Sequence, residues 1–240
     1  MRSSTALSRR YKLNRIARAA LVSLVGVLGL LLSVNLAPID AQARSQALAL
    51  NQDLAANALG KLAVKGRAPK TGYSRSLFSD GWGSVNGCDT RNFILRRDLR
   101  SITWRSGASC LVATGILQDP YTGRTINFVR GVRTSLAVQI DHVVAVSDAW
   151  QKGAQQLSAN SRYRFFNDPL NLLAVDGPTN EAKGDGDAAT WLPPNKAFRC
   201  SYVARQIAVK SKYKLWVTNS EKDAMARVLG ACPKQLLPVG

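Results

Sequence analysis

The sequence predicts a small α+β protein, with short strands in the middle of the chain and a pair of helices at its end. Two observations support this fold class. From residue 88 onward, short apolar runs alternate with turn signals, and two longer amphipathic segments then close the chain. Hydrophobic residues make up 46% of the 240 residues and charged residues 20%, which excludes a wholly disordered, collagen-like or coiled-coil protein.

The first 43 residues have the order of regions found in an export signal. Residues 1–18 carry six cations and no acid, and 21 uncharged residues follow at 19–39. Ala41-Gln42-Ala43 then has the small-x-small pattern that signal peptidase cleaves. We expect either cleavage after Ala43 or retention of residues 19–39 as an anchor. Both outcomes place the rest of the chain outside, secreted or held on the outer side of the cell membrane.

The chain is strongly basic, with 33 Lys and Arg against 15 Asp and Glu and a net charge of +18. Residues 1–43 contribute six cations and one acid, so residues 44–240 still carry +13. Such a surface attracts polyanions, of which nucleic acid and an anionic envelope are the main candidates. The single His and the four Cys exclude a His-rich metal cage and a multi-zinc array.

The four cysteines are expected to form two disulfides. None belongs to a C-x-x-C pair, which zinc ribbons and thioredoxin-like sites need, and export places them outside the reducing cytosol. Of the three pairings that four cysteines allow, we expect Cys88–Cys110 and Cys200–Cys232, because each closes a short local loop. Four free buried thiols remain the alternative if the chain stays in the cytosol.

Three parts are expected along the chain: a signal peptide or signal anchor at 1–43, an N-terminal helix and linker at 44–87, and a folded domain at 88–240. Residues 45–64 are rich in Ala and Leu, which predicts a helix. Residues 65–87 are cationic and then rich in Gly and Ser, which is typical of a linker.

Within the folded domain, the elements are predicted from local patterns. The expected order is a helix at 91–99, a hairpin of 109–117 and 124–129, strands at 138–140 and 171–175, a short helical piece at 180–183, and helices at 198–212 and 219–229. Pro120 and Gly123 are placed to make the hairpin turn. Thr218 and Glu221 predict a capping box for the last helix. We expect Trp150 and Trp191 in the core, and turn or capping roles for four acids, Asp148, Asp168, Asp185 and Asp187.

The residues suited to chemistry gather around the only imidazole, His142, which follows Asp141 at the end of a predicted strand. Hydrolysis of a phosphodiester needs a base near neutral pH, which His can supply. It also needs neutralisation of the phosphate charge, commonly by Mg²⁺ held by oxygen ligands such as Asp141 and the amide of Asn180. Adjacent residues on a regular strand face opposite sides, so a strand end or bulge is needed for Asp141 and His142 to flank one phosphate.

The run V-Q-I-D-H-V-V-A-V-S-D-A-W, followed by N-D-P-L-N-L-L-A-V-D-G-P-T-N-E-A-K-G-D, resembles the HNH (ββα-metal) endonucleases. More narrowly, it is similar to the GmrSD-type HNH domain of secreted bacterial proteins, as are G-C-D-T-R-N-F-I-L-R-R-D-L upstream and W-L-P-P-N-K-A-F-R-C-S-Y-V-A-R-Q downstream. The resemblance covers roughly residues 86–233 and leaves the N-terminal third unexplained. It implies a ββα-metal core to which the hairpin and the disulfide-stapled helical pair are added.

The resemblance also implies roles for five residues. His142 matches the general base that activates water, and Asp141 the metal ligand beside it. Asn171 matches the central Asn, which holds the loop and orients the His. Asn180 stands where the final His of the name often lies, as a neutral and weaker ligand. Lys183, one helical turn later, can touch a phosphate or the leaving oxygen. From the residues alone, Asn171 also suits a turn, Asn180 a helix cap and Lys183 a solvated surface.

The expected function is therefore a metal-dependent endonuclease of low sequence specificity, acting on DNA more readily than on RNA. Mg²⁺ is the expected ion, with Mn²⁺ or another transition metal as alternatives. Arg97 and Arg205 are expected to contact the substrate, and the scattered cations show no code for base readout. No protein partner is inferred, and membrane contact is expected only through an uncleaved N-terminal segment. The alternatives are a cationic nucleic-acid or envelope-binding exported protein with a decayed HNH core, and a hydrolase of another phosphodiester.

Overall fold

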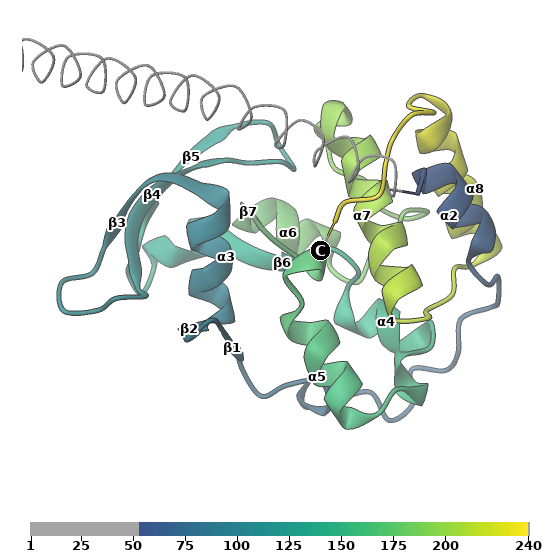
Figure 1. Cartoon of the computed structure of the whole chain (residues 1–240), viewed down its shortest axis with the longest axis horizontal. Helices are drawn as coiled ribbons and strands as arrows, with labels where there is room; N and C mark the ends of the chain where they lie inside the picture. The colour runs from purple at the N-terminus through teal and green to yellow at the C-terminus, as the bar shows by residue number, and fades with distance from the viewer. Residues whose placement is uncertain (1–52, 240) are drawn as a thin grey trace, which may run out of the picture. The chain divides into compact units, whose positions relative to one another are not determined.

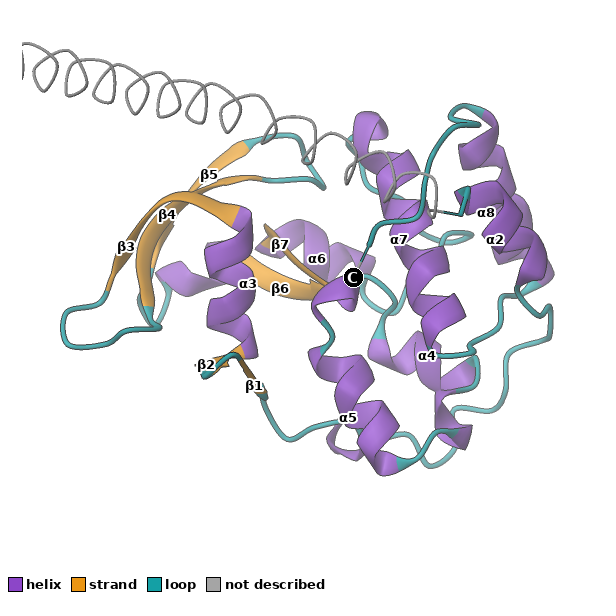
Figure 2. Cartoon of the chain, viewed as in Figure 1, coloured by secondary structure: helices purple, strands orange, loops and turns teal. Residues whose placement is uncertain are grey.

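The structure is a computed structural model that describes residues 53–239. The predicted signal segment and the start of the helix predicted at 45–64 lie outside these residues. The described part is a mixed α+β fold of small antiparallel sheets and short helices (Figure 1), and helices form most of its regular structure (Figure 2). Within residues 53–239, no helix combines the length and the apolar character needed to cross a bilayer.

The strands form three separate antiparallel sheets. They are β1 (Ser84–Val85) with β2 (Cys88–Asp89), then β3 (Leu99–Trp104), β4 (Val112–Gln118) and β5 (Thr125–Val129), and finally β6 (Val138–His142) with β7 (Leu172–Asp176). The predicted hairpin is confirmed as β4–β5. Its turn is closed by the Asp119 carboxylate, which accepts from Thr122 N at 2.7 Å, and by Gly123 at φ 77°. Glycine suits this left-handed conformation because it has no Cβ.

The helices are spread along the whole described chain. The longer ones are α2 (Ala55–Lys61), α3 (Thr90–Asp98), α4 (Val146–Gln151), α5 (Ala159–Asn167), α6 (Gly177–Lys183), α7 (Arg199–Lys212) and α8 (Asn219–Gly230). The predictions of α3, α7 and α8 are confirmed to within one residue at each end. The helices α4 and α5 and the strand β3 were not predicted from the sequence.

Three apolar clusters hold these elements together. One cluster joins Ile94 and Leu95 of α3 to residues of the three-stranded sheet and of the β6–β7 pair, and Figure 1 shows helix α3 between these strands. A second joins α2, α7 and α8 to the other face of β7, through residues such as Leu173 and Val175. The third packs α4 and α5 against α7 and includes Trp150, whose predicted core position is confirmed. The β6–β7 pair is therefore covered on both faces.

Both predicted disulfides are present. Cys88–Cys110 joins β2 to the segment before β4, with a Cα–Cα distance of 5.5 Å. Cys200–Cys232 joins the first turn of α7 to the second residue after α8, with a Cα–Cα distance of 6.4 Å.

The capping box predicted for α8 is only half formed. Glu221 N donates to Thr218 Oγ1 at 3.2 Å, as predicted. The Glu221 side chain, however, points into the protein, where Lys152 Nζ lies 2.7 Å and Lys210 Nζ 3.0 Å from its two oxygens. Two buried ammonium groups attract the carboxylate more strongly than one backbone amide at the helix end.

Glu221 is part of a larger group that we call the buried ion cluster. Its members are Arg67, Asp148, Lys152, Asp187, Lys210 and Glu221. Lys152 Nζ lies 2.7 Å from oxygens of all three acids. The expectation of a turn or capping role for Asp148 is therefore wrong: its carboxylate is buried among cations. Asp187 combines both roles, because it also accepts from Ala189 N at 3.0 Å.

Candidate active site

The candidate site lies at the end of β6, where Asp141 and His142 follow each other in a regular antiparallel register. Asp141 is opposite Leu173 and His142 opposite Leu172 of β7, without a bulge between them. Their side chains therefore point to opposite faces of the strand pair, as strand geometry requires. Of the two alternatives that the sequence left open, a strand end and a bulge, the described chain shows the strand end, and the two side chains have separate surroundings.

His142 is 4% exposed and is enclosed by aromatic rings. Its imidazole lies almost parallel to the Trp82 ring, at 11° and 5.7 Å between centroids, and 4.5 Å from the Phe166 ring. His142 Nε2 lies 2.8 Å from the carbonyl oxygen of Phe166. Because a carbonyl only accepts, Nε2 carries the proton and donates, which leaves the free lone pair on Nδ1.

The environment of His142 keeps it neutral. Burial lowers its pKa to about 3, and the positive charge of Arg75 adds to this, while the hydrogen bond to Phe166 acts in the opposite direction. A neutral imidazole can accept a proton, but burial that lowers the pKa this far also makes His142 a weaker base than a free imidazole.

Asp141 is buried, with both carboxylate oxygens already bonded. Tyr121 donates its hydroxyl proton to Oδ2, and Lys183 Nζ donates to Oδ1 at 2.8 Å. Burial raises the pKa of Tyr121 well above its usual value, and the charge of Asp141 raises it further, so this hydroxyl stays protonated and donating.

Asn171 fixes the backbone immediately after His142. Its side-chain Oδ1 accepts from Val144 N at 2.9 Å, and its Nδ2 donates to Val144 O at 3.4 Å. Its own backbone oxygen accepts from Val143 N at 2.8 Å. Asn171 is fully buried. These contacts are those expected of a residue that holds the loop at the end of β6.

Asn180 and Lys183 both lie on α6, which begins directly after β7. Asn180 Nδ2 donates to Gln139 Oε1 at 2.8 Å, and Gln139 lies two residues before Asp141 on the same face of β6. Lys183 is 3% exposed and donates to both Asp141 and the backbone oxygen of His142, each at 2.8 Å. It is therefore not the solvated cation that the sequence left open as an alternative.

The donors near Asp141 are of the type that a divalent ion prefers, since a carboxylate and an amide oxygen are both hard ligands. Their arrangement is different from that of an open site, because the Lys183 ammonium stands at Asp141 Oδ1 and neutralises it. Within residues 53–239, no three side chains among His, Cys, Asp and Glu are grouped to hold a metal ion. A divalent ion could bind Asp141 only with Lys183 displaced from that oxygen.

The two arginines expected to bind substrate instead brace the segment around Asn171. Arg97 pairs with Asp98 and donates to the backbone oxygens of Pro169 and Leu172, each at 2.7 Å. Arg205 donates to the Leu170 oxygen at 2.9 Å. Their nitrogen atoms thus satisfy the carbonyls that lead into β7.

Sequence reasoning did not select four residues that surround the site: Arg75, Trp82, Tyr121 and Phe166. Three of them contact Asp141 or His142 directly, and Arg75 acts on His142 through its charge. Tyr121 lies between Pro120 and Gly123 in the predicted hairpin turn. Arg75 and Trp82 lie in the segment predicted to be a linker. A sign of a packed residue there is Trp82 itself, which stands between two glycines.

Fold and site together define a class of protein: a small, disulfide-bonded α+β protein whose only imidazole is buried and neutral and directly follows a buried Asp in the sequence. A family model described as the C-terminal domain of GmrSD restriction endonucleases matches residues 89–228. An uncharacterized secreted protein of Arthroderma benhamiae is 38% identical over 177 residues, which cover 72% of this chain and 82% of that protein. The chain belongs to the GmrSD restriction endonuclease C-terminal domain family, which confirms the predicted resemblance and supports a nuclease acting on nucleic acid.

Proposed function

We propose that this protein is an exported endonuclease of the HNH type, with low sequence specificity and His142 as its general base. The observation that carries the proposal is the bond from His142 Nε2 to the Phe166 carbonyl. It leaves a neutral imidazole with its lone pair on Nδ1, at the end of a strand that belongs to the matched family region.

The order of β6, β7 and α6 supports a ββα core around this base. Two antiparallel strands are followed without a gap by a helix, and the helix returns Asn180 and Lys183 to β6. The Asp176 carboxylate begins the helix by accepting from Thr179 N at 2.9 Å. The residues matched to the motif are thereby brought to one short strand pair and one helix.

In the proposed reaction, His142 Nδ1 removes a proton from water. The resulting hydroxide attacks phosphorus in line with the departing 3′ oxygen, which leaves 5′-phosphate and 3′-hydroxyl ends. Asn171 keeps the backbone after His142 in place, so the ring orientation is fixed before substrate arrives. A divalent ion, Mg²⁺ or Mn²⁺, would neutralise charge on the phosphate, and Asp141 and Asn180 are the proposed ligands. Because Asp141 and His142 face opposite sides of β6, the ion and the base could serve one phosphate only at the end of the strand, and only with Lys183 displaced from Asp141. DNA is the proposed substrate, with RNA as the alternative.

Export of the mature chain is part of the proposal. Two disulfides, the predicted signal segment and a relative named as secreted all support it.

A second candidate is a cationic nucleic-acid-binding protein without catalysis. Two observations favour it: His142 is almost completely buried, and the Asp141 carboxylate is neutralised by Lys183. This candidate predicts salt-sensitive binding of DNA and no cleavage with any divalent ion.

Cleavage of plasmid DNA tests the two candidates. The wild type and His142→Gln are incubated with Mg²⁺ or Mn²⁺, and then with a chelator. The glutamine amide can still donate to the Phe166 carbonyl but cannot accept a proton, so a loss of about two to four decades in rate is expected. Matching melting temperatures for the two proteins show that the fold is retained.

Binding of Mn²⁺, measured by calorimetry, tests the metal ligands separately from activity. Asp141→Asn is expected to weaken binding strongly, because it removes the only carboxylate of the proposed pair. If His142→Gln cleaves as fast as the wild type, the general-base mechanism is wrong. If the wild type binds DNA but never cleaves it, the non-catalytic candidate is correct.

A further inference from the structure

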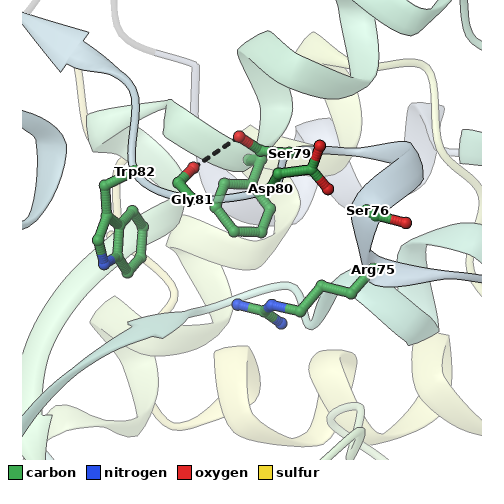
Figure 3. Close-up of a pocket in the computed structure, with 7 residues that line it drawn as sticks. Arg75, Ser76, Ser79, Asp80, Gly81 and Trp82 are labelled. Atoms are coloured by element: carbon green, nitrogen blue, oxygen red, sulfur yellow. Dashed lines mark hydrogen bonds between the residues drawn. The ribbon is translucent and has the colours of Figure 1, made fainter.

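A pocket of about 360 Å³ lies near His142, on the far side of the Trp82 and Phe166 rings. Most of its wall comes from one segment before β1, and the remainder from α5. Figure 3 shows the residues that line it, which are Arg75, Ser76, Ser79, Asp80, Gly81, Trp82 and Phe166. We call it the Arg75–Trp82 pocket.

Two of its aromatic walls are the same rings that enclose His142. Trp82 lies parallel to the imidazole, the Phe166 ring contacts it, and the Phe166 backbone oxygen accepts a hydrogen bond from His142 Nε2. The pocket is therefore separated from the candidate base by a single layer of side chains. A ligand in it would lie one layer of side chains away from His142.

Hydrogen bonds to α5 hold in place the segment that forms most of the pocket wall. Arg162 of α5 donates to the Leu77 oxygen at 3.0 Å, and Gly83 N donates to Asn167 Oδ1 at 2.7 Å. A Cβ on Gly83 would stand 2.3 Å from the Tyr163 hydroxyl, so this close approach to α5 needs glycine. These contacts fix both ends of the segment that carries Arg75 and Trp82.

The pocket has one positive and one negative side chain, Arg75 and Asp80, which point to different sides. The guanidinium carbon of Arg75 lies 4.8 Å from the centre of the Phe166 ring, and among the described residues it has no carboxylate partner within ion-pair distance. In Figure 3 its guanidinium points toward the side on which Trp82 lies, and the Asp80 carboxylate points to the other side. A ligand with an anionic group, a flat ring and hydrogen-bond donors matches this arrangement.

We propose that the Arg75–Trp82 pocket binds one unpaired nucleotide of the substrate, with Arg75 on a phosphate and Trp82 against the base. The proposal rests on the nuclease function proposed above and names the substrate feature that the site selects. Stacking on an indole needs a base with a free face, which single-stranded nucleic acid offers and a duplex offers only after unstacking. Single strands, frayed ends and gaps are thus the preferred substrates.

Binding of a short labelled oligothymidylate, which stays unpaired, tests the proposal. The oxidised full chain is titrated by fluorescence anisotropy in chelator at physiological salt, and the probe length is checked on a gel. Arg75→Gln is expected to weaken binding about tenfold, the loss expected for a charge-assisted contact to phosphate. Arg227→Gln, which makes the same charge change on the exposed face of α8, is expected to weaken it less than twofold.

Tryptophan fluorescence tests the stacking directly. Oligothymidylate is expected to quench the emission of the wild type, and Trp82→Phe is expected to remove this quenching. A hairpin duplex of equal charge is expected to quench neither protein.

The proposal is overturned if Arg75→Gln and Arg227→Gln weaken binding equally, because the effect is then only that of overall charge. It is also overturned if inorganic phosphate displaces the Arg75-dependent binding while no quenching occurs, since the pocket is then a simple anion site. Plasmid cleavage by the same proteins separates the two proposals. If the wild type cleaves DNA but its binding does not depend on Arg75, only the proposed nucleotide binding in the pocket is wrong. If binding depends on Arg75 but no cleavage occurs, only the proposed nuclease activity is wrong.

Discussion

Lys183, at the end of α6, is paired inside the protein with Asp141 and with the backbone oxygen of His142. Its ammonium thereby links the helix to both residues at the end of β6. A buried ion pair gives little net stability as a whole, but removal of one partner leaves an uncompensated charge. The contribution of Lys183 to stability thus depends on whether Asp141 is charged.

Lys183→Met keeps the length of the side chain and removes its charge. We expect it to lower the free energy of unfolding by about 3 kcal/mol, because Asp141 is left buried beside only the Tyr121 hydroxyl. Urea denaturation at pH 7 measures the change.

Lys70→Met is the matched control, since Lys70 pairs with Asp185 at 3.1 Å on the exposed surface. A loss below about 1 kcal/mol is expected there. The double variant Asp141→Asn, Lys183→Met should recover part of the loss. Additive losses in the double variant would show that the two residues are not coupled.

At the scale of secondary-structure elements, the disulfide Cys200–Cys232 ties α7 to the end of α8. It closes a loop with a sequence separation of 32. Replacement of both cysteines by Ala is expected to lower the free energy of unfolding by about 3 kcal/mol, because the unfolded chain gains conformational freedom. Reduction of the wild type opens both disulfides and should cause a loss at least as large. An unchanged denaturation midpoint in the double Ala variant would assign the stability of this helical pair to its apolar contacts alone.

Elements that are determined by residues close to them in the sequence could be predicted, and elements without such local signals could not. The β4–β5 turn and the start of α8 were predicted because Pro120, Gly123 and Thr218 act on their own neighbours. The strand β3 was missed because it follows α3 at once and is mostly exposed, so it shows no clear apolar alternation. For the same reason, its irregular register against β4 left no pattern in the sequence.

The candidate site shows the same division. The Asp141–His142 motif and Asn171 could be selected from the sequence, and Asn171 makes the loop contacts that were expected of it. Lys183 was selected as well, but its pairing with Asp141, 42 residues away, was not predicted, and Trp82, which is further still from His142, was not selected. No spacing rule for a helix or strand covers contacts over such separations.

For the molecule as a whole, the buried ion cluster couples stability to pH. Burial by itself would raise the pKa of Asp187, but its bonds to Lys152 and the charge of Arg67 outweigh this and lower it to about 2. A carboxyl group whose pKa is lowered by folding stabilises the folded state above its unfolded pKa of 3.8 and loses this contribution as pH falls toward 2.

Stability of the wild type is therefore expected to fall by about 2 kcal/mol between pH 4 and pH 2 through Asp187 alone. Asp187→Asn should be less stable than the wild type at pH 6, and the difference should shrink as pH falls through this window. Urea denaturation at several pH values gives both curves. A difference that is constant with pH would mean that folding does not change the pKa of Asp187.

The same cluster limits how this sequence can change. Three acids and three bases from separate parts of the chain share their partners, so any single change of charge leaves an unmatched ion in the interior. Neutral replacements are tolerated only when an acid and a base are exchanged together for apolar residues of similar volume. A designer who wishes to simplify the interior of this protein must therefore replace an acid of the cluster together with a base that pairs with it, and not one residue at a time.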